Sequence, residues 1–161
     1  MVTPIPPLGT NWCWAASGQM AMNALEMQVQ HLQCEQANQR FGFNDCCKLP
    51  RPGRCEQPGG GIPPLREFSS VPSQGALTSD QIKDEICVQQ RPFLVVTPGT
   101  GGGGHMVIAI DYAADDQGEL LVVYNPWMKG KVDQGYITLD DYKNTHTTND
   151  HDFYKIKKGP Q

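Results

Sequence analysis

Apolar positions follow a helical pattern in the first part of the chain. Between residues 12 and about 30 nearly every position favours a helix, and apolar side chains surround most of its circumference. This pattern is typical of a buried helix. Prolines and a glycine precede it, and Asn11 stands close to the N-cap position. Cys13 is therefore expected in the first turn of the helix.

Two further helices and five strands are expected. Helical patterns cover residues 34–41 and 78–89, and the second begins at Thr78 or Ser79, followed by acidic residues that suit a helix N-terminus. After Arg91, short runs rich in Val, Ile, Leu and Tyr alternate with turn residues. These runs are RPFLVVTP, HMVIAIDYA, ELLVVYNP, QGYITLDDY and DFYKIKKG. They predict a twisted antiparallel sheet.

The order of these elements predicts an α+β protein with one domain. A helical lobe of about residues 1–90 is followed by a β lobe of about residues 91–161, and a cleft between such lobes is a natural place for a site. With 161 residues, of which 39% are hydrophobic, the chain is long enough to bury a core.

Charge and hydropathy exclude two classes of partner. The chain carries 13 basic and 17 acidic residues, a net charge of −4, and lacks the basic excess that phosphate binding requires. Its longest apolar run is too short to span a bilayer, and its first residues have no signal-peptide pattern. We therefore expect neither nucleic acid nor a membrane as a partner.

Three residues form a candidate nucleophilic site. A cysteine at a helix N-terminus lies at the positive end of the helix dipole, which favours the thiolate of Cys13. Four glycines lead into His105 at the start of a strand, and the following strand ends near Asn125. An imidazole can act as acid and base for the thiolate, and an asparagine carbonyl can hold its tautomer. This spacing suits the facing ends of two adjacent strands.

The motifs NWCWAAS, QCEQANQRFGFNDCC with CEQP, GGGGHMVIAIDY and VVYNPWMKG occur in this order. As a set they resemble the papain-like cysteine peptidases, and most closely a bacterial branch with AvrRpt2-type effectors and C39-like domains. The resemblance implies a papain-like fold, with Cys13 as nucleophile, His105 as general acid and base, and Asn125 as the residue that orients it. It also implies that Trp127 shields the hydrogen bond between His105 and Asn125 from water.

The resemblance implies a cysteine endopeptidase without a cofactor. We expect a bacterial effector or toxin domain that is secreted or translocated and acts on a protein substrate in another cell, as a monomer, with a cognate inhibitor or immunity protein as a possible partner. One alternative is a C39-like peptidase that processes leader peptides. Another is a catalytically weak pseudoprotease that binds peptides.

One departure from the family concerns the oxyanion hole. The family glutamine that precedes the cysteine is replaced by Pro7 and Leu8. The backbone N–H of Cys13 remains as one donor, and the side chain of Asn11 or the hydroxyl of Thr10 is a candidate for the second. Alternatively, Asn11 only caps the helix.

The other cysteines allow two interpretations. Either they are reduced and packed, or they form disulfides among Cys34, Cys46, Cys47 and Cys55, with Cys87 buried in its helix. We expect no metal site, because the cluster has no C-x-x-C pair and no nearby histidine. Two other histidines, His146 and His151, lie in a polar turn and are expected to be solvated.

Overall fold

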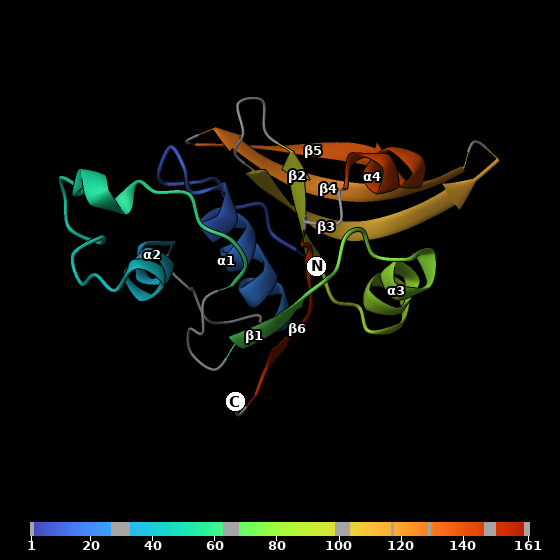
Figure 1. Cartoon of the computed structure of the whole chain (residues 1–161), viewed down its shortest axis with the longest axis horizontal. Helices are drawn as coiled ribbons and strands as arrows, with labels where there is room; N and C mark the ends of the chain where they lie inside the picture. The colour runs from blue at the N-terminus through green and yellow to red at the C-terminus, as the bar shows by residue number, and fades with distance from the viewer. Residues whose placement is uncertain are drawn as a thin grey trace.

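The computed structural model describes residues 2–26, 33–62, 68–98, 104–116, 118–128, 130–146 and 151–159. The expected α+β class is confirmed, because N-terminal helices precede a six-stranded antiparallel sheet that carries further helices (Figure 1). Within the described ranges, no helix is long and apolar enough to cross a membrane.

The helices match the expected positions. Helix α1 covers Cys13–Glu26, so Cys13 is its first residue, and residues 27–30 of the expected helix lie outside the described residues. Helix α2 covers Gln33–Phe41. Helix α3 covers Ser79–Lys83 and continues as a π-helical turn over Asp84–Val88, and Thr78 caps α3 through a capping box with Gln81. A short 3₁₀ turn covers Gly53–Cys55.

The sheet contains the five expected strands and one that the pattern did not predict. Its strands are β1 (Phe68–Pro72), β2 (Phe93–Pro98), β3 (Gly104–Asp115), β4 (Gly118–Met128), β5 (Lys131–Thr138) and β6 (Phe153–Lys158). Their order in the sheet is β1-β6-β2-β3-β4-β5. The unpredicted strand β1 lies at the edge and pairs with β6, so one strand from before residue 90 belongs to the same sheet as the β half.

A fourth helix replaces the end of an expected strand. The run QGYITLDDY forms β5 only as far as Thr138, and helix α4 then covers Leu139–Thr145. The Thr138 side chain accepts a hydrogen bond from the backbone N–H of Asp141, so this threonine ends the strand by capping the helix.

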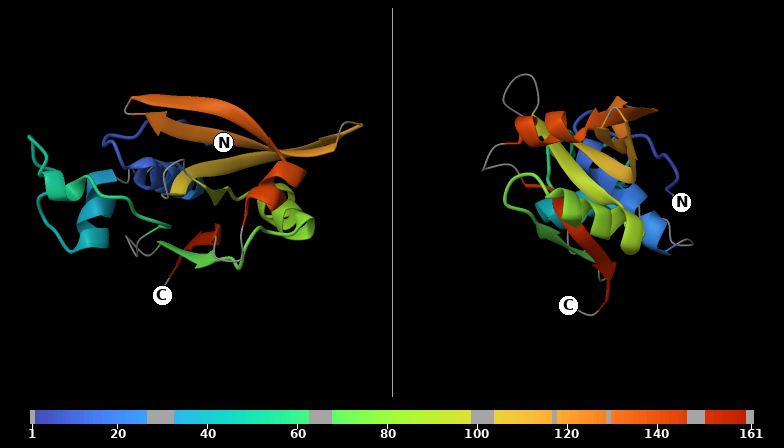
Figure 2. Two further views of the ribbon diagram at one scale, coloured as in Figure 1. Left: turned by 45° about the horizontal axis from the view of Figure 1, so that its top comes forward. Right: turned by 90° about the vertical axis from the view of Figure 1, so that its right-hand side faces the viewer.

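Both faces of the sheet are covered, which explains the nearly continuous apolar runs of β2 and β3. Side chains alternate between faces along a strand. Leu94 and Ile108 pack with α1, whereas Phe93, Val95 and Val107 pack with α3 and α4. Helix α1 contacts β2, β3, β4 and β6, and it lies between the β4–β5 end and the β1–β6 end of the sheet (Figure 2).

Four of the cysteines form two disulfides near α2. The pairs are Cys34–Cys47 and Cys46–Cys55, the four residues that the disulfide interpretation named. The expectation that Cys87 is buried was wrong, because this free thiol is exposed. Ile82 and Ile86, four residues apart, form the buried face of their helix, and Cys87 points away from it.

The expectation for His146 was also wrong. Its side chain is only 1% exposed, and Nε2 lies 3.0 Å from Oδ1 of the fully buried Asp152. His151 is exposed as expected, and its Nδ1 lies 2.6 Å from the carbonyl oxygen of Ser73. His146, directly after α4, thus lies in the core, where it meets a carboxylate that follows it by only six residues.

Candidate active site

The fold brings Cys13 and His105 together from distant parts of the chain. Cys13 begins α1, and His105 is the second residue of β3, directly after Gly104. The two side chains line the same cleft, where the imidazole lies close enough to lower the pKa of the thiol, and both residues are partly buried. The glycines at residues 101–103, which precede His105 in the sequence, lie outside the described residues. Helix and strand meet here because α1 packs along β3.

Asn125 and Trp127 contact the other side of the imidazole. Both come from β4, where they are two residues apart. Nε2 of His105 is 2.6 Å from Oδ1 of Asn125, so Nε2 carries the hydrogen and Nδ1 is left for the thiol. The ring of Trp127 packs edge-on against His105 with 5.1 Å between centroids, although 57% of its own surface is exposed.

An irregularity of the sheet accompanies this arrangement. The pairing of β4 with β5 shifts by one residue between Asn125 and Met128, where Pro126 has no N–H to give to the ladder. Such shifts change where the neighbouring side chains point and are common next to active sites.

The electrostatics favour a thiolate paired with an imidazolium. Burial raises the pKa of Cys13, but hydrogen bonds from His105 and from the backbone N–H of Met106, with the charge of His105, outweigh it and hold this pKa below its usual value. Burial lowers the pKa of His105, but its hydrogen bonds with Cys13 and Asn125 raise it overall. Both shifts favour the thiolate–imidazolium pair over the neutral pair, because they lower the higher pKa, that of the thiol, and raise the lower one, that of the imidazole.

The segment before the nucleophile is fixed by two polar side chains. The fully buried Gln33 accepts a hydrogen bond from the N–H of Leu8 at 2.8 Å and donates to the carbonyl of Pro6 at 2.7 Å. Oε2 of Glu56 accepts from the N–H of Thr10 at 2.9 Å. The loop that enters α1 is thus held on both sides.

Asn11, the candidate second oxyanion donor, is part of this loop and also helps to fix it. Its Nδ2 donates to the backbone carbonyl of Glu56 at 2.8 Å. An amide nitrogen has two hydrogens, so this contact fixes the orientation of the group and uses only one of them. Its role in the oxyanion hole stays a prediction.

We expect Asn11→Asp to lower kcat by about 100-fold, because it removes a donor and places a negative charge near the oxyanion. Peptide hydrolysis at saturating substrate and a thermal melt check this. A lower Tm with unchanged kcat would show that Asn11 only anchors the loop. Thr10→Val, which keeps the backbone contact with Glu56, is the matched control, and a fall in its kcat would assign the donor to the Thr10 hydroxyl.

A cleft of about 230 Å³ adjoins the thiol. It is lined by Cys13, His105, Met106, Gly104, Val96 and the segment 58–60. That segment lies close to α1. Trp14 Nε1 donates a hydrogen bond to the carbonyl of Gln57 at 3.3 Å, and a Cβ atom added at Gly59 would lie only 2.7 Å from the Trp14 ring. Glycine at position 59 therefore allows the cleft wall to approach α1.

Sequence reasoning missed two contributors to the site. The wall at residues 58–60 had a signal in the glycine run of CEQPGGG. No signal in the sequence pointed to the Met106 N–H, because every residue except proline carries a backbone N–H.

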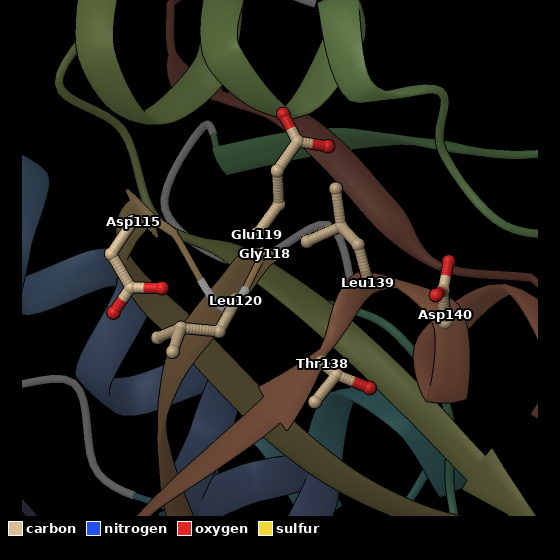
Figure 3. Close-up of a pocket in the computed structure, with 7 residues that line it drawn as sticks. All are labelled: Asp115, Gly118, Glu119, Leu120, Thr138, Leu139 and Asp140. Atoms are coloured by element: carbon tan, nitrogen blue, oxygen red, sulfur yellow. The ribbon is translucent and has the colours of Figure 1, made fainter.

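A larger hollow of about 440 Å³ lies elsewhere, beside the turn that joins β3 and β4 (Figure 3). It contains three carboxylates, from Asp115, Glu119 and Asp140, and no residue of the candidate site. Glu119 is paired with Lys83 at 2.8 Å. Its carboxylate points toward the helix above the sheet, away from Asp115 (Figure 3).

Among the described residues, one group, Asp45, Cys46 and Cys55, has its possible ligand atoms within 4.8 Å of one another. Both sulfurs are joined in a disulfide and so cannot act as thiolates. The donor set does not fit a metal ion.

No protein-family model matches the sequence, and no curated protein is significantly similar to it.

If Asn125 acts only by orienting the imidazole and makes no bond to a substrate, Asn125→Ala is expected to weaken peptide hydrolysis by less than about 100-fold. Hydrolysis rates for the two single variants Asn125→Ala and Cys13→Ala check this. A loss as deep as that of Cys13→Ala, together with a lower Tm, would assign Asn125 a structural role.

Proposed function

We propose that this protein is a papain-like cysteine endopeptidase. The observation that carries the proposal is the chain of contacts in which Cys13 meets His105 and Nε2 of His105 meets Asn125 Oδ1 at 2.6 Å. These contacts join a nucleophile, an acid and base, and an orienting group in the order that acyl transfer by a thiol requires.

The reaction follows from these groups. The Cys13 thiolate attacks the carbonyl carbon of a peptide bond, and the oxyanion that forms is stabilised by the Cys13 N–H and a second donor, for which Asn11 is the candidate. His105 then gives its proton to the leaving amine, and a thioester remains on Cys13. His105 next removes a proton from water, which hydrolyses the thioester and restores the thiolate.

The cleft supports a peptide as substrate rather than a small molecule. It is an open groove beside the thiol, and backbone of residues 58–60 forms one wall, with Val96 and Met106 among its apolar lining. We infer that an extended peptide lies along this wall. The same groove would serve a pseudoprotease, but the lowered pKa of Cys13 favours an enzyme.

The place of action is proposed from the cysteines. Two disulfides favour an oxidising compartment, which fits a secreted protein. Delivery into another cell as an effector or toxin, and control by an inhibitor or immunity protein, remain proposals based on the family resemblance.

Alkylation of Cys13 as a function of pH tests the reactive ion pair. We expect iodoacetamide to modify Cys13 with a midpoint below the value of about 8.5 for an ordinary thiol. His105→Ala should move this midpoint upward, because the imidazolium that favours the thiolate is lost. Peptide mapping by mass spectrometry separates Cys13 from the free and exposed Cys87, and Cys87→Ala is the matched control. An ordinary midpoint for Cys13 that His105→Ala does not change would refute the ion pair.

A further inference from the structure

Met106 follows His105 in β3. Its main-chain polar groups face α1 rather than the neighbouring strands. Met106 lies opposite Val96 of β2, but the N–H of Val96 donates to Oδ1 of Asp152 at 3.0 Å. On the other side, the pairing of β3 with β4 begins at Ile108 opposite Tyr124. Met106 thus lies outside the paired part of β3 and β4. On this side its main chain faces the N-terminal part of α1.

Both main-chain polar groups of Met106 bind α1. Its N–H lies close enough to the sulfur of Cys13 to lower the pKa of that thiol, and its carbonyl accepts a hydrogen bond from the Ser17 hydroxyl at 3.1 Å. In an extended strand, the N–H and C=O of one residue point to the same side. Cys13 and Ser17 are four residues apart and so lie on one face of the helix in successive turns. One strand residue therefore contacts α1 at two points.

The Ser17 contact is built into the core. Ser17 is fully buried, as are its helix neighbours Ala15 and Ala16, and Met106 is only 3% exposed. A buried carbonyl without a donor is costly, so the hydroxyl fixes the distance between helix and strand at this point. Because His105 is the preceding residue of β3, the position of Met106 also determines where the His105 ring lies.

We propose that Ser17 is a positioning residue for the nucleophile: by holding the Met106 carbonyl against α1, it keeps the Met106 N–H and the His105 ring in contact with the Cys13 sulfur. This inference rests on the proposed function only in taking Cys13 as the reactive thiol. Ser17 touches neither the substrate nor the sulfur, and it acts through the backbone of Met106.

The inference has a consequence that a merely structural serine would not have. A hydrogen bond to the thiolate favours the charged form, so a loosened Met106 N–H makes the thiolate less stable. In the Ser17→Ala variant, the midpoint of the alkylation profile of Cys13 should therefore move toward alkaline pH. The rate below the midpoint should fall several-fold, to the order of 10-fold, while the rate on the alkaline plateau is kept, because a thiolate of higher pKa is at least as nucleophilic.

The experiment compares Ser17→Ala with Ser73→Ala in a Cys87→Ala background, with iodoacetamide as probe. Ser73 is a suitable control because it is also buried, at 7% exposure, and its hydroxyl also binds main chain, with Oγ 2.6 Å from the carbonyl of Gly75. Ser73→Ala should lower Tm and leave the alkylation profile unchanged. An unchanged profile in Ser17→Ala, whatever its Tm, would overturn the inference.

The probe reaction needs no peptide substrate. If the profile shifts in Ser17→Ala but the wild-type protein hydrolyses no peptide, the proposed function fails and the role of Ser17 stands. If the wild type hydrolyses peptides and Ser17→Ala keeps both profile and kcat, the role of Ser17 fails alone.

Discussion

Cys13→Ala and His105→Ala are each expected to lower the rate of peptide hydrolysis by a factor on the order of 10⁴ to 10⁶. In the proposed mechanism, the thiolate forms the bond to the substrate, and His105 supplies the proton without which the amine cannot leave. Because the two act as one unit, the double variant should be no slower than either single variant. Rates of hydrolysis of a peptide that the wild-type protein cleaves check this, and Cys87→Ala is the control.

The fold of these variants should remain cooperative. Cys13 and His105 are partly exposed and line the cleft, so their truncation removes little core packing. Thermal melts of the single and double variants separate a loss of chemistry from a loss of structure. Activity in Cys13→Ala would show that another residue is the nucleophile, and additive losses would show that His105 acts independently of the thiol.

Asp152→Ala is expected to give the largest loss of stability, about 3 to 5 kcal/mol, which corresponds to a fall in Tm on the order of 10 °C. Its fully buried carboxylate accepts hydrogen bonds from the N–H of Val96 at 3.0 Å and from the Tyr142 hydroxyl, and it faces His146 Nε2 at 3.0 Å. Nδ1 of His146 meets the carbonyl of Tyr142 at 2.6 Å, so a doubly protonated ring satisfies both contacts.

Removal of this carboxylate leaves three donors without an acceptor: the N–H of Val96 in β2, the hydroxyl of Tyr142 in α4 and the ring of His146 just after α4. Burial beside Asp152 raises the pKa of Tyr142, which keeps its hydroxyl protonated as a donor. Asp152→Asn, which keeps the shape, should cost less than Asp152→Ala. The control is Lys83→Gln, which breaks an ion pair whose side chains are 44% and 34% exposed and should leave Tm nearly unchanged. Equal melting of Asp152→Ala and the wild type would mean that the network does not hold the sheet and α4 together.

The parts of the fold that could be predicted are those with a strong local pattern. The start of α1 at Cys13, the cap at Thr78 and the apolar strands β2 to β4 all follow from residue types and spacing. Strand β1 could not be found, because it is short and half-exposed and exists through its pairing with β6, which lies more than 80 residues later.

The candidate site shows the same limit. Cys13, His105 and Asn125 could be predicted because their chemistry requires particular side chains, and the structure places them together. Met106 could not, because its backbone N–H acts at the thiol and any residue except proline carries one. The burial of His146 also has no local signal, since it depends on the contact of its ring with the buried Asp152.

The central claim is that Cys13 cleaves peptide bonds, and mapping of new protein N-termini tests it most directly. Cell extracts incubated with wild-type protein are compared by mass spectrometry with extracts incubated with Cys13→Ala and Cys87→Ala. The account predicts a defined set of new N-termini with wild type and Cys87→Ala, and none of that set with Cys13→Ala. The same set of N-termini with Cys13→Ala, or no new N-termini with the wild-type protein while its Cys13 is reduced, would contradict it.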